Sequence, residues 1–178
     1  MYRTGHLGAA LCCGAPGILA FQALTEPLLA GIWLSGLVAT ASLPDIDQRL
    51  PIPHRGPTHS LLFAVVVSSI VAGATAVLVE TVATSTLTTL FDGVLELDRP
   101  LVLAGVAGGS ALVGILSHLL ADAITVGRGA FAIKPLWPVR ARTLRFGLTT
   151  ADSTRWNYGL FVVGTTAVVG ATVLPTLR

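Results

Sequence analysis

Five long stretches of the chain carry no charged residue, and this spacing constrains the fold more than any other feature of the sequence. The stretches cover residues 7–24, 27–44, 60–79, 100–121 and 156–177. Each is close to the roughly 20 apolar residues that an α-helix needs to cross a hydrocarbon core about 30 Å thick. The sequence therefore predicts an all-α fold, a polytopic membrane bundle of about five transmembrane helices.

The composition favours a membrane protein over a water-soluble one. Of the 178 residues, 53% are hydrophobic and 11% are charged, whereas soluble domains carry about 25% charged residues. Five spans leave no room for a soluble appendage, so we expect a single integral-membrane domain over residues 1–178. Any chemistry must then come from helix ends and connecting loops.

The distribution of basic residues predicts the orientation in the membrane. If all five stretches span, the N-terminus and the loops 44–59 and 122–155 lie on one side, which then holds nine of the eleven Lys and Arg residues. Cytoplasmic loops carry an excess of positive charge, so this side should be cytoplasmic. Its basic residues are Arg3, Arg49, Arg55, Arg128, Lys134, Arg140, Arg142, Arg145 and Arg155.

The same side collects all four histidines and several aspartates. The segment SHLLADAIT places His118 and Asp122 four residues apart on one expected helix. Such a pair projects from one face about one turn apart, so both side chains can reach a common ion. Taken alone, the pair could equally be a helix-end histidine hydrogen-bonded to a nearby carboxylate.

A second cluster lies in the segment LPDIDQRLPIPHRGPTHSLLFA. Asp45 and Asp47 share a proline-bounded turn, and His54 precedes His59 at the entrance to the third span, which Thr58 is expected to cap. Taken alone, the aspartates could form a solvated turn, and each histidine could have a capping or interfacial role. Together with His6 and the pair on the fourth span, these residues predict a site for one or more divalent ions of the zinc, manganese or iron class.

The ligand types also suggest what such a site does. Structural zinc sites are usually rich in thiolate, whereas sites of histidine and carboxylate commonly leave a position open for water or substrate. An ion with an open position activates water and stabilises the oxyanion that develops during hydrolysis. The expected metal ligands are His6, Asp45, Asp47, His59, His118 and Asp122.

Four segments of the chain also carry a family resemblance. They are GHLGAA (residues 5–10), PDID with HRGPTHS (within 44–60), SHLLADAIT (117–125) and KPLWPVRARTLRFG (134–147). With these motifs the chain resembles a family of membrane-bound, metal-dependent hydrolases, the YdjM-like, LexA-binding inner-membrane-associated proteins. That family is remotely similar to the zinc-dependent phospholipase C and P1 nuclease superfamily, which cleaves phosphate esters. The resemblance implies the same six residues as ligands or near-ligands, with His54 and Arg55 beside them.

The connector 127–155 mixes basic residues with Phe131, Trp137 and Phe146. This mixture suits the headgroup layer, where tryptophan sits at the interface and arginine meets phosphate. The positive charge could also serve orientation alone. If the connector contributes to the site, one or two of its arginines would join Arg55 in holding a phosphate.

The sequence thus predicts an integral-membrane hydrolase that uses metal-activated water on a phosphoester of a lipid or another amphiphile at the cytoplasmic face. In this hypothesis Arg55 steadies the negative charge of the substrate, and His6 or His54 completes the shell or relays a proton. Two alternatives stay open: a metal-ion transporter or sensor, and a non-enzymatic membrane adaptor. Nucleic acid is the weaker partner, because the basic residues are few and are held at a membrane surface.

Overall fold

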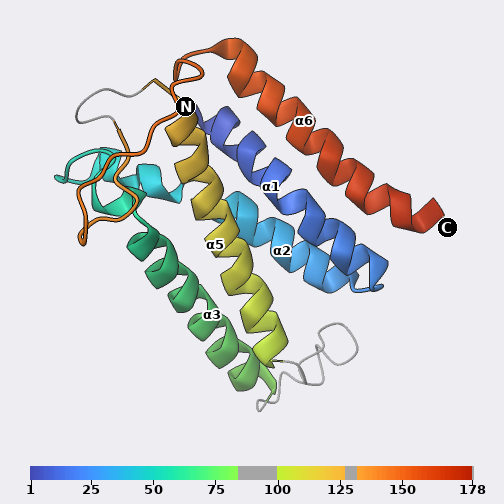
Figure 1. The fold of residues 1–178 in the computed structure, drawn as a ribbon. Coiled ribbons are helices and arrows are strands. Elements are labelled where there is room, and N and C mark those ends of the chain that lie inside the picture. Colours follow the sequence, from blue (N-terminus) through green and yellow to red (C-terminus); the bar gives the residue numbers. More distant parts are fainter. Residues whose placement is uncertain (84–99, 127–131, 178) are drawn as a thin grey trace.

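The computed structural model describes residues 1–83, 100–126 and 132–177, and within them the protein is helical. Its long helices are α1 (Arg3–Ala23), α2 (Pro27–Thr40), α3 (Leu61–Ala83), α5 (Pro100–Ile124) and α6 (Thr154–Val173) (Figure 1). Short 3₁₀ segments are η1 (Leu43–Arg49), η2 (Pro57–His59) and η4 (Leu174–Leu177). No strand occurs in the described ranges. Five helical segments are long and apolar enough to cross a membrane, which confirms the predicted fold class.

Helix α5 lies at the centre of the bundle. It packs against α1, α2 and α3, while α6 lies along α1 on the outside (Figure 1). Helix α3 has the highest mean hydropathy of the candidate spans, 2.5, and yet exposes many of its apolar side chains. Lipid tails are as apolar as leucine, so such a surface is stable inside a bilayer.

Glycine allows the helices to approach closely where packing replaces the hydrophobic drive. A Cβ atom added at Gly108 of α5 would lie 2.9 Å from the carbonyl oxygen of Ser68 on α3. A Cβ atom added at Gly164 of α6 would lie 2.5 Å from the carbonyl oxygen of Gly8 on α1. These two positions therefore bring α3 and α6 into backbone contact with the helices that carry the candidate site.

Two helix starts differ from the sequence prediction. Helix α1 begins at Arg3, so His6 lies within the helix and not before it. Thr58 does not cap α3, because its hydroxyl donates a hydrogen bond to Asp47. Ser60 takes that role, since its extended backbone precedes the helix and its Oγ accepts a hydrogen bond from the Phe63 N–H at 3.1 Å.

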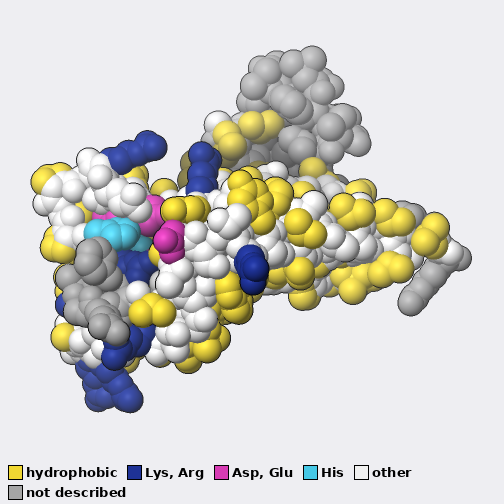
Figure 2. Space-filling model, turned by 90° about the horizontal axis from the view of Figure 1, so that it is seen from above, with side chains coloured by type: hydrophobic (Ala, Val, Ile, Leu, Met, Phe, Trp, Pro, Cys, Tyr) yellow, Lys and Arg dark blue, Asp and Glu magenta, His cyan; other side chains and the backbone are white. Residues whose placement is uncertain are grey.

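The start of α1, the segment 41–60 and the connector after α5 lie at the same end of the bundle (Figure 1). Backbone hydrogen bonds fasten the connector, for example Leu61 N–H to the Pro135 carbonyl at 2.8 Å and Phe146 N–H to the Ala123 carbonyl at 2.6 Å. Figure 2 shows histidine and acidic side chains together at this end, with several basic side chains around them. The predicted connector residues Arg128 and Phe131 lie outside the described residues.

Candidate metal centre

Two buried histidines from different elements face each other at the centre of the cluster. His59 ends η2 and His118 lies near the end of α5, and their Nε2 atoms are 3.2 Å apart. The Nδ1 atom of His118 lies 2.8 Å from the Ala41 carbonyl oxygen. A carbonyl oxygen can only accept, so Nδ1 carries the proton and Nε2 directs its lone pair at His59.

The neighbours of His59 also place the proton on Nδ1 of its ring, as in His118. Its Nδ1 atom lies 3.2 Å from Asp47 Oδ2 and 3.1 Å from Thr58 Oγ1. The Thr58 hydroxyl donates its proton to Asp47 at 2.8 Å, so both oxygens are available to accept from Nδ1–H of His59. Two lone-pair nitrogens therefore face each other, which is unfavourable unless a cation lies between them.

Two carboxylates extend this pair to a set of four donor atoms. Asp45 Oδ1 lies 3.8 Å from His59 Nε2 and 3.7 Å from His118 Nε2. Asp122 Oδ2 lies 3.3 Å and 3.9 Å from the same two atoms. Ligands at the corners of a tetrahedron around zinc are roughly 3.4 Å apart, given bonds of about 2.0–2.1 Å. Five of the six separations among these four atoms are 3.2–3.9 Å, which is close to this spacing, so the donors are near enough to share an ion.

His6 stands against this four-atom set from the first turn of α1. Its ring stacks on that of His118 with 3.7 Å between centroids, and its Nε2 atom lies 3.6 Å from Asp122 Oδ1. Among the described residues, neither ring nitrogen of His6 has a hydrogen-bond partner, nor has Asp122 Oδ2, although all three atoms are buried. Buried polar atoms without partners are rare in native proteins, and a bound cation would satisfy Asp122 Oδ2 and the lone-pair nitrogen of His6.

The donor atoms leave room for more than one arrangement of ions. Two sets of three donors each lie within 4.8 Å of one another: His6, His118 and Asp122 form one set, and Asp45, His54 and His59 form the other. The sets meet at the contact between His59 and His118. One ion shared between the sets, or an ion in each, is compatible with these positions.

Asp47 contacts the cluster through His59 and not directly. Its Oδ1 atom lies 2.8 Å from His54 Nδ1, and its Oδ2 atom accepts hydrogen bonds from the Arg55 backbone N–H and from Thr58. Both oxygens are thus engaged away from the four-atom set. A carboxylate behind a ligating histidine fixes the tautomer and the ring orientation, which is the common arrangement at zinc sites.

Arg55 neutralises the buried carboxylate on α5. Its Nη2 atom donates to Asp122 Oδ1 at 2.8 Å, and its backbone lies in the left-handed region with φ 59°. The Met1 amino group donates to the same oxygen at 3.0 Å. Asp122 therefore turns Oδ1 towards positive groups and Oδ2 towards the two histidines. Arg55, which the sequence suggested as a substrate contact, is 7% exposed and held by the protein itself.

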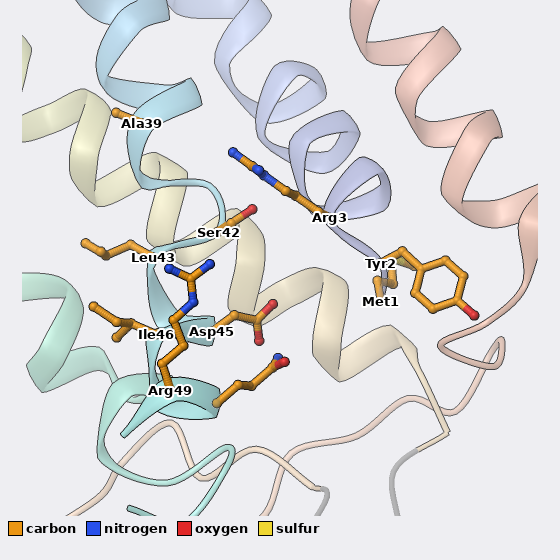
Figure 3. Close-up of a pocket in the computed structure, with 10 residues that line it drawn as sticks. Met1, Tyr2, Arg3, Ala39, Ser42, Leu43, Asp45, Ile46 and Arg49 are labelled. Carbon is orange, nitrogen blue, oxygen red and sulfur yellow. The ribbon is translucent and has the colours of Figure 1, made fainter. Parts of the chain in front are cut away.

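Solvent reaches the cluster beside Asp45. The Asp45 side chain is 23% exposed, whereas those of His6, His59, His118 and Asp122 are 0–1% exposed. A cavity of about 260 Å³ lies next to His54, Arg55 and Asp122, and a larger one of about 640 Å³ lies between the start of α1 and η1. Asp45 lines both cavities, so a substrate would approach the cluster along this residue (Figure 3).

Several groups that support the site were missed in the sequence. The Ala41 carbonyl gives no sequence signal, and Thr58 was interpreted as a helix cap. Asn157 of α6 is fully buried, accepts from the Tyr2 N–H at 2.9 Å and donates to the carbonyl oxygens of Ala151 and Ser153. The last span thus fastens the start of α1, and an asparagine inside an otherwise apolar stretch was the available signal.

Comparison with known proteins places the chain in a family. A family model described as YdjM inner membrane protein matches residues 1–176, a range that includes all five helices and every residue of the cluster. Neither the curated proteins nor the solved structures contain a significant match to the chain.

Proposed function

The chain belongs to the YdjM inner membrane protein family, and we propose that it is an integral-membrane metal-dependent hydrolase. The observation that carries this proposal is the four-atom set of His59 Nε2, His118 Nε2, Asp45 Oδ1 and Asp122 Oδ2, in which five of the six separations are 3.2–3.9 Å. Histidine and carboxylate donors that converge at the end of a membrane bundle, with Asp122 Oδ2 buried and without a partner among the described residues, are costly without a cation. Their cost is explained if the protein binds a divalent ion.

In this proposal the four atoms hold the ion, and His6 stands beside them as an additional ligand. Zinc fits the nitrogen and oxygen donors best, and manganese or iron is compatible with them. Asp47 and the Ala41 carbonyl orient the two central histidines from behind. Asp47, expected from the sequence to be a ligand, is therefore assigned a positioning role.

We infer hydrolysis because the site is open to water on the side of Asp45. A bound divalent ion supplies Lewis-acid activation of a phosphoryl oxygen and of water. Asp45 is the ligand next to both cavities, so substrate and water would enter there. The His54 side chain is 33% exposed and hydrogen-bonded to Asp47, so it can exchange a proton between the site and solvent.

The position of the site supports an amphiphilic substrate. The cluster lies where the apolar helices end, which is the depth of lipid headgroups, and Trp137 and Arg140 of the connector line an apolar groove at the same end of the bundle. We favour a phosphoester as the bond that is cleaved, because arginines surround the site and guanidinium groups bind phosphate. The excess of basic residues at this end supports a cytoplasmic location.

Elemental analysis of the protein purified in detergent tests the metal first. We expect a stoichiometric transition metal that His118→Ala removes, and then phosphoesterase activity on a panel of phosphorylated lipids assayed with that metal. Protein that neither retains nor rebinds such a metal would overturn the proposal. Metal flux into proteoliposomes without any hydrolysis would favour transport in its place.

A further inference from the structure

The larger of the two cavities described beside the cluster contains two arginines with no acidic partner among the described residues. It has a volume of about 640 Å³ and is lined by the first residues of α1, the end of α2 and η1. In Figure 3, Arg3 reaches from α1 and Arg49 from the end of η1 into the same opening, with Ser42 between them and Asp45 beside them. The two side chains come from segments far apart in the sequence and converge on one space.

Neither guanidinium group is satisfied by the protein. Over residues 1–83, 100–126 and 132–177, no ion pair and no side-chain hydrogen bond forms at Arg3 or Arg49. The acidic side chain in the cavity is Asp45, whose carboxylate faces His59 and His118. Both arginine side chains are exposed, so solvent weakens their mutual repulsion, and an anion between them would be attracted by both.

We propose that this cavity binds the phosphate group of a membrane amphiphile, with Arg3 and Arg49 as its ligands. This inference deepens the proposed function, since it names the substrate group that would lie beside Asp45. Guanidinium groups match phosphate oxygens with two parallel N–H donors, and two of them suit an anion with several oxygens. Ser42 and Gln48 line the same cavity and add neutral donors.

The remaining lining of the cavity favours an amphiphile over a free anion. Ala39, Leu43 and Ile46 border the cavity on the side of α2 and η1, and Ile46 is 41% exposed. The cavity therefore joins a positive wall to an apolar one at the end of a membrane-spanning helix. A headgroup phosphate would meet the arginines while its hydrocarbon part follows the apolar wall into the bilayer.

Titration calorimetry in a non-ionic detergent tests this site on the metal-loaded protein. The probes are monomeric dihexanoyl phosphatidic acid and inorganic phosphate. We expect the double variant Arg3→Gln/Arg49→Gln to weaken binding of the phosphatidic acid by roughly tenfold or more, because two charge-assisted contacts are lost. The variant Arg3→Lys/Arg49→Lys keeps the charge without the planar fork, so an intermediate loss is expected.

A matched control removes the same charge elsewhere. Arg142→Gln/Arg155→Gln removes two exposed arginines that do not line this cavity, and its affinity for the phosphatidic acid should equal that of the wild type. Equal losses in the two glutamine variants would show general attraction to a basic surface and overturn the proposal. So would wild-type affinity in Arg3→Gln/Arg49→Gln when metal content and elution from gel filtration show a folded protein.

The remaining outcomes distinguish a lipid phosphate from free phosphate, and they distinguish failure of this binding site from failure of the hydrolase function. Inorganic phosphate that binds as tightly as the phosphatidic acid, with the same dependence on both arginines, would overturn the assignment to an amphiphile. Arginine-dependent binding without hydrolysis of any phosphoester would support this site while the hydrolase function fails. Hydrolysis with an unchanged KM in Arg3→Gln/Arg49→Gln would support the hydrolase and overturn this site.

Discussion

His59 and His118 are 59 residues apart in the sequence, and their Nε2 atoms lie 3.2 Å from each other in the core of the site. The protons on both rings are directed outwards, to Asp47 and Thr58 from His59 and to the Ala41 carbonyl from His118. Hydrogen bonds from the outer side of each ring thus hold the two Nε2 lone pairs so that they point at the same place. Under the proposed function an ion between them would account for this arrangement, and the proposal defines which substitutions should abolish metal binding.

His118→Ala should abolish stoichiometric metal binding, because it removes one of four donors and leaves a space that no neighbouring ligand fills. In the wild type, metal at about 100 times its Kd should stabilise the fold by about 2.7 kcal/mol, and the variant should show no such gain. Thermal unfolding with and without added zinc measures this difference. Ser117→Ala on the same helix is the control, since the Ser117 hydroxyl donates to the Gly114 carbonyl and belongs to neither donor set, so this variant should keep most of the affinity. An equal loss in both variants would contradict the assignment of the ligands.

Asp45→Asn and Asp47→Asn should separate ligation from positioning. Asp45→Asn keeps an amide oxygen but removes the negative charge at a position 3.7–3.8 Å from both central histidines, so metal binding should be weakened more than in Asp47→Asn and the spectrum of the bound metal should change. Replacing Asp47 leaves the donors in place but weakens the hold on His59, and the loss of such a partner typically costs about 10–100-fold in affinity. Cobalt(II) spectra at saturation report the ligand set directly. We expect the wild-type spectrum from the Asp47→Asn protein, and an altered spectrum there would show that Asp47 is itself a ligand.

The sequence predicted the membrane spans well. It predicted less well which residues contact the central histidines directly and which lie behind them. Charge-free stretches define where a helix can cross the bilayer, so the five long helices of the described residues overlap the five predicted stretches. The charge pattern also brought the histidines and aspartates to one end. It could not distinguish Asp45 from Asp47, because the two residues share one turn, and their roles depend on which carboxylate meets the Arg55 N–H and Thr58. A backbone acceptor such as the Ala41 carbonyl is invisible in any sequence pattern.

Substitutions at Arg55 should separate its charge from its backbone conformation. Both Arg55→Ala and Arg55→Gly remove the cation from buried Asp122, which should cost about 3 kcal/mol in the metal-free protein. Alanine must also adopt φ 59°, a conformation that glycine reaches without strain, so the alanine variant should be less stable than the glycine variant by about 1 kcal/mol. Added metal should reduce the loss in both variants, because the ion also neutralises Asp122.

Thermal unfolding of the wild type and the two variants, metal-free and metal-loaded, gives these differences. Equal stability of the two variants would show that the backbone carries no strain at this position.

Gly164→Ala should destabilise the contact between α1 and α6, while Gly170→Ala on the same helix should not. A Cβ atom at Gly164 would lie 2.5 Å from the Gly8 carbonyl oxygen, whereas nothing lies within 4 Å of one at Gly170. Overpacking of this kind costs about 1–3 kcal/mol, and alanine at an open helical site gains about 0.5–1 kcal/mol over glycine. Thermal unfolding in detergent, followed by circular dichroism, compares the two variants. Because α1 also carries His6, the separation of α1 from α6 in Gly164→Ala should weaken metal binding as well, and unchanged stability and affinity would contradict the close packing of these two spans.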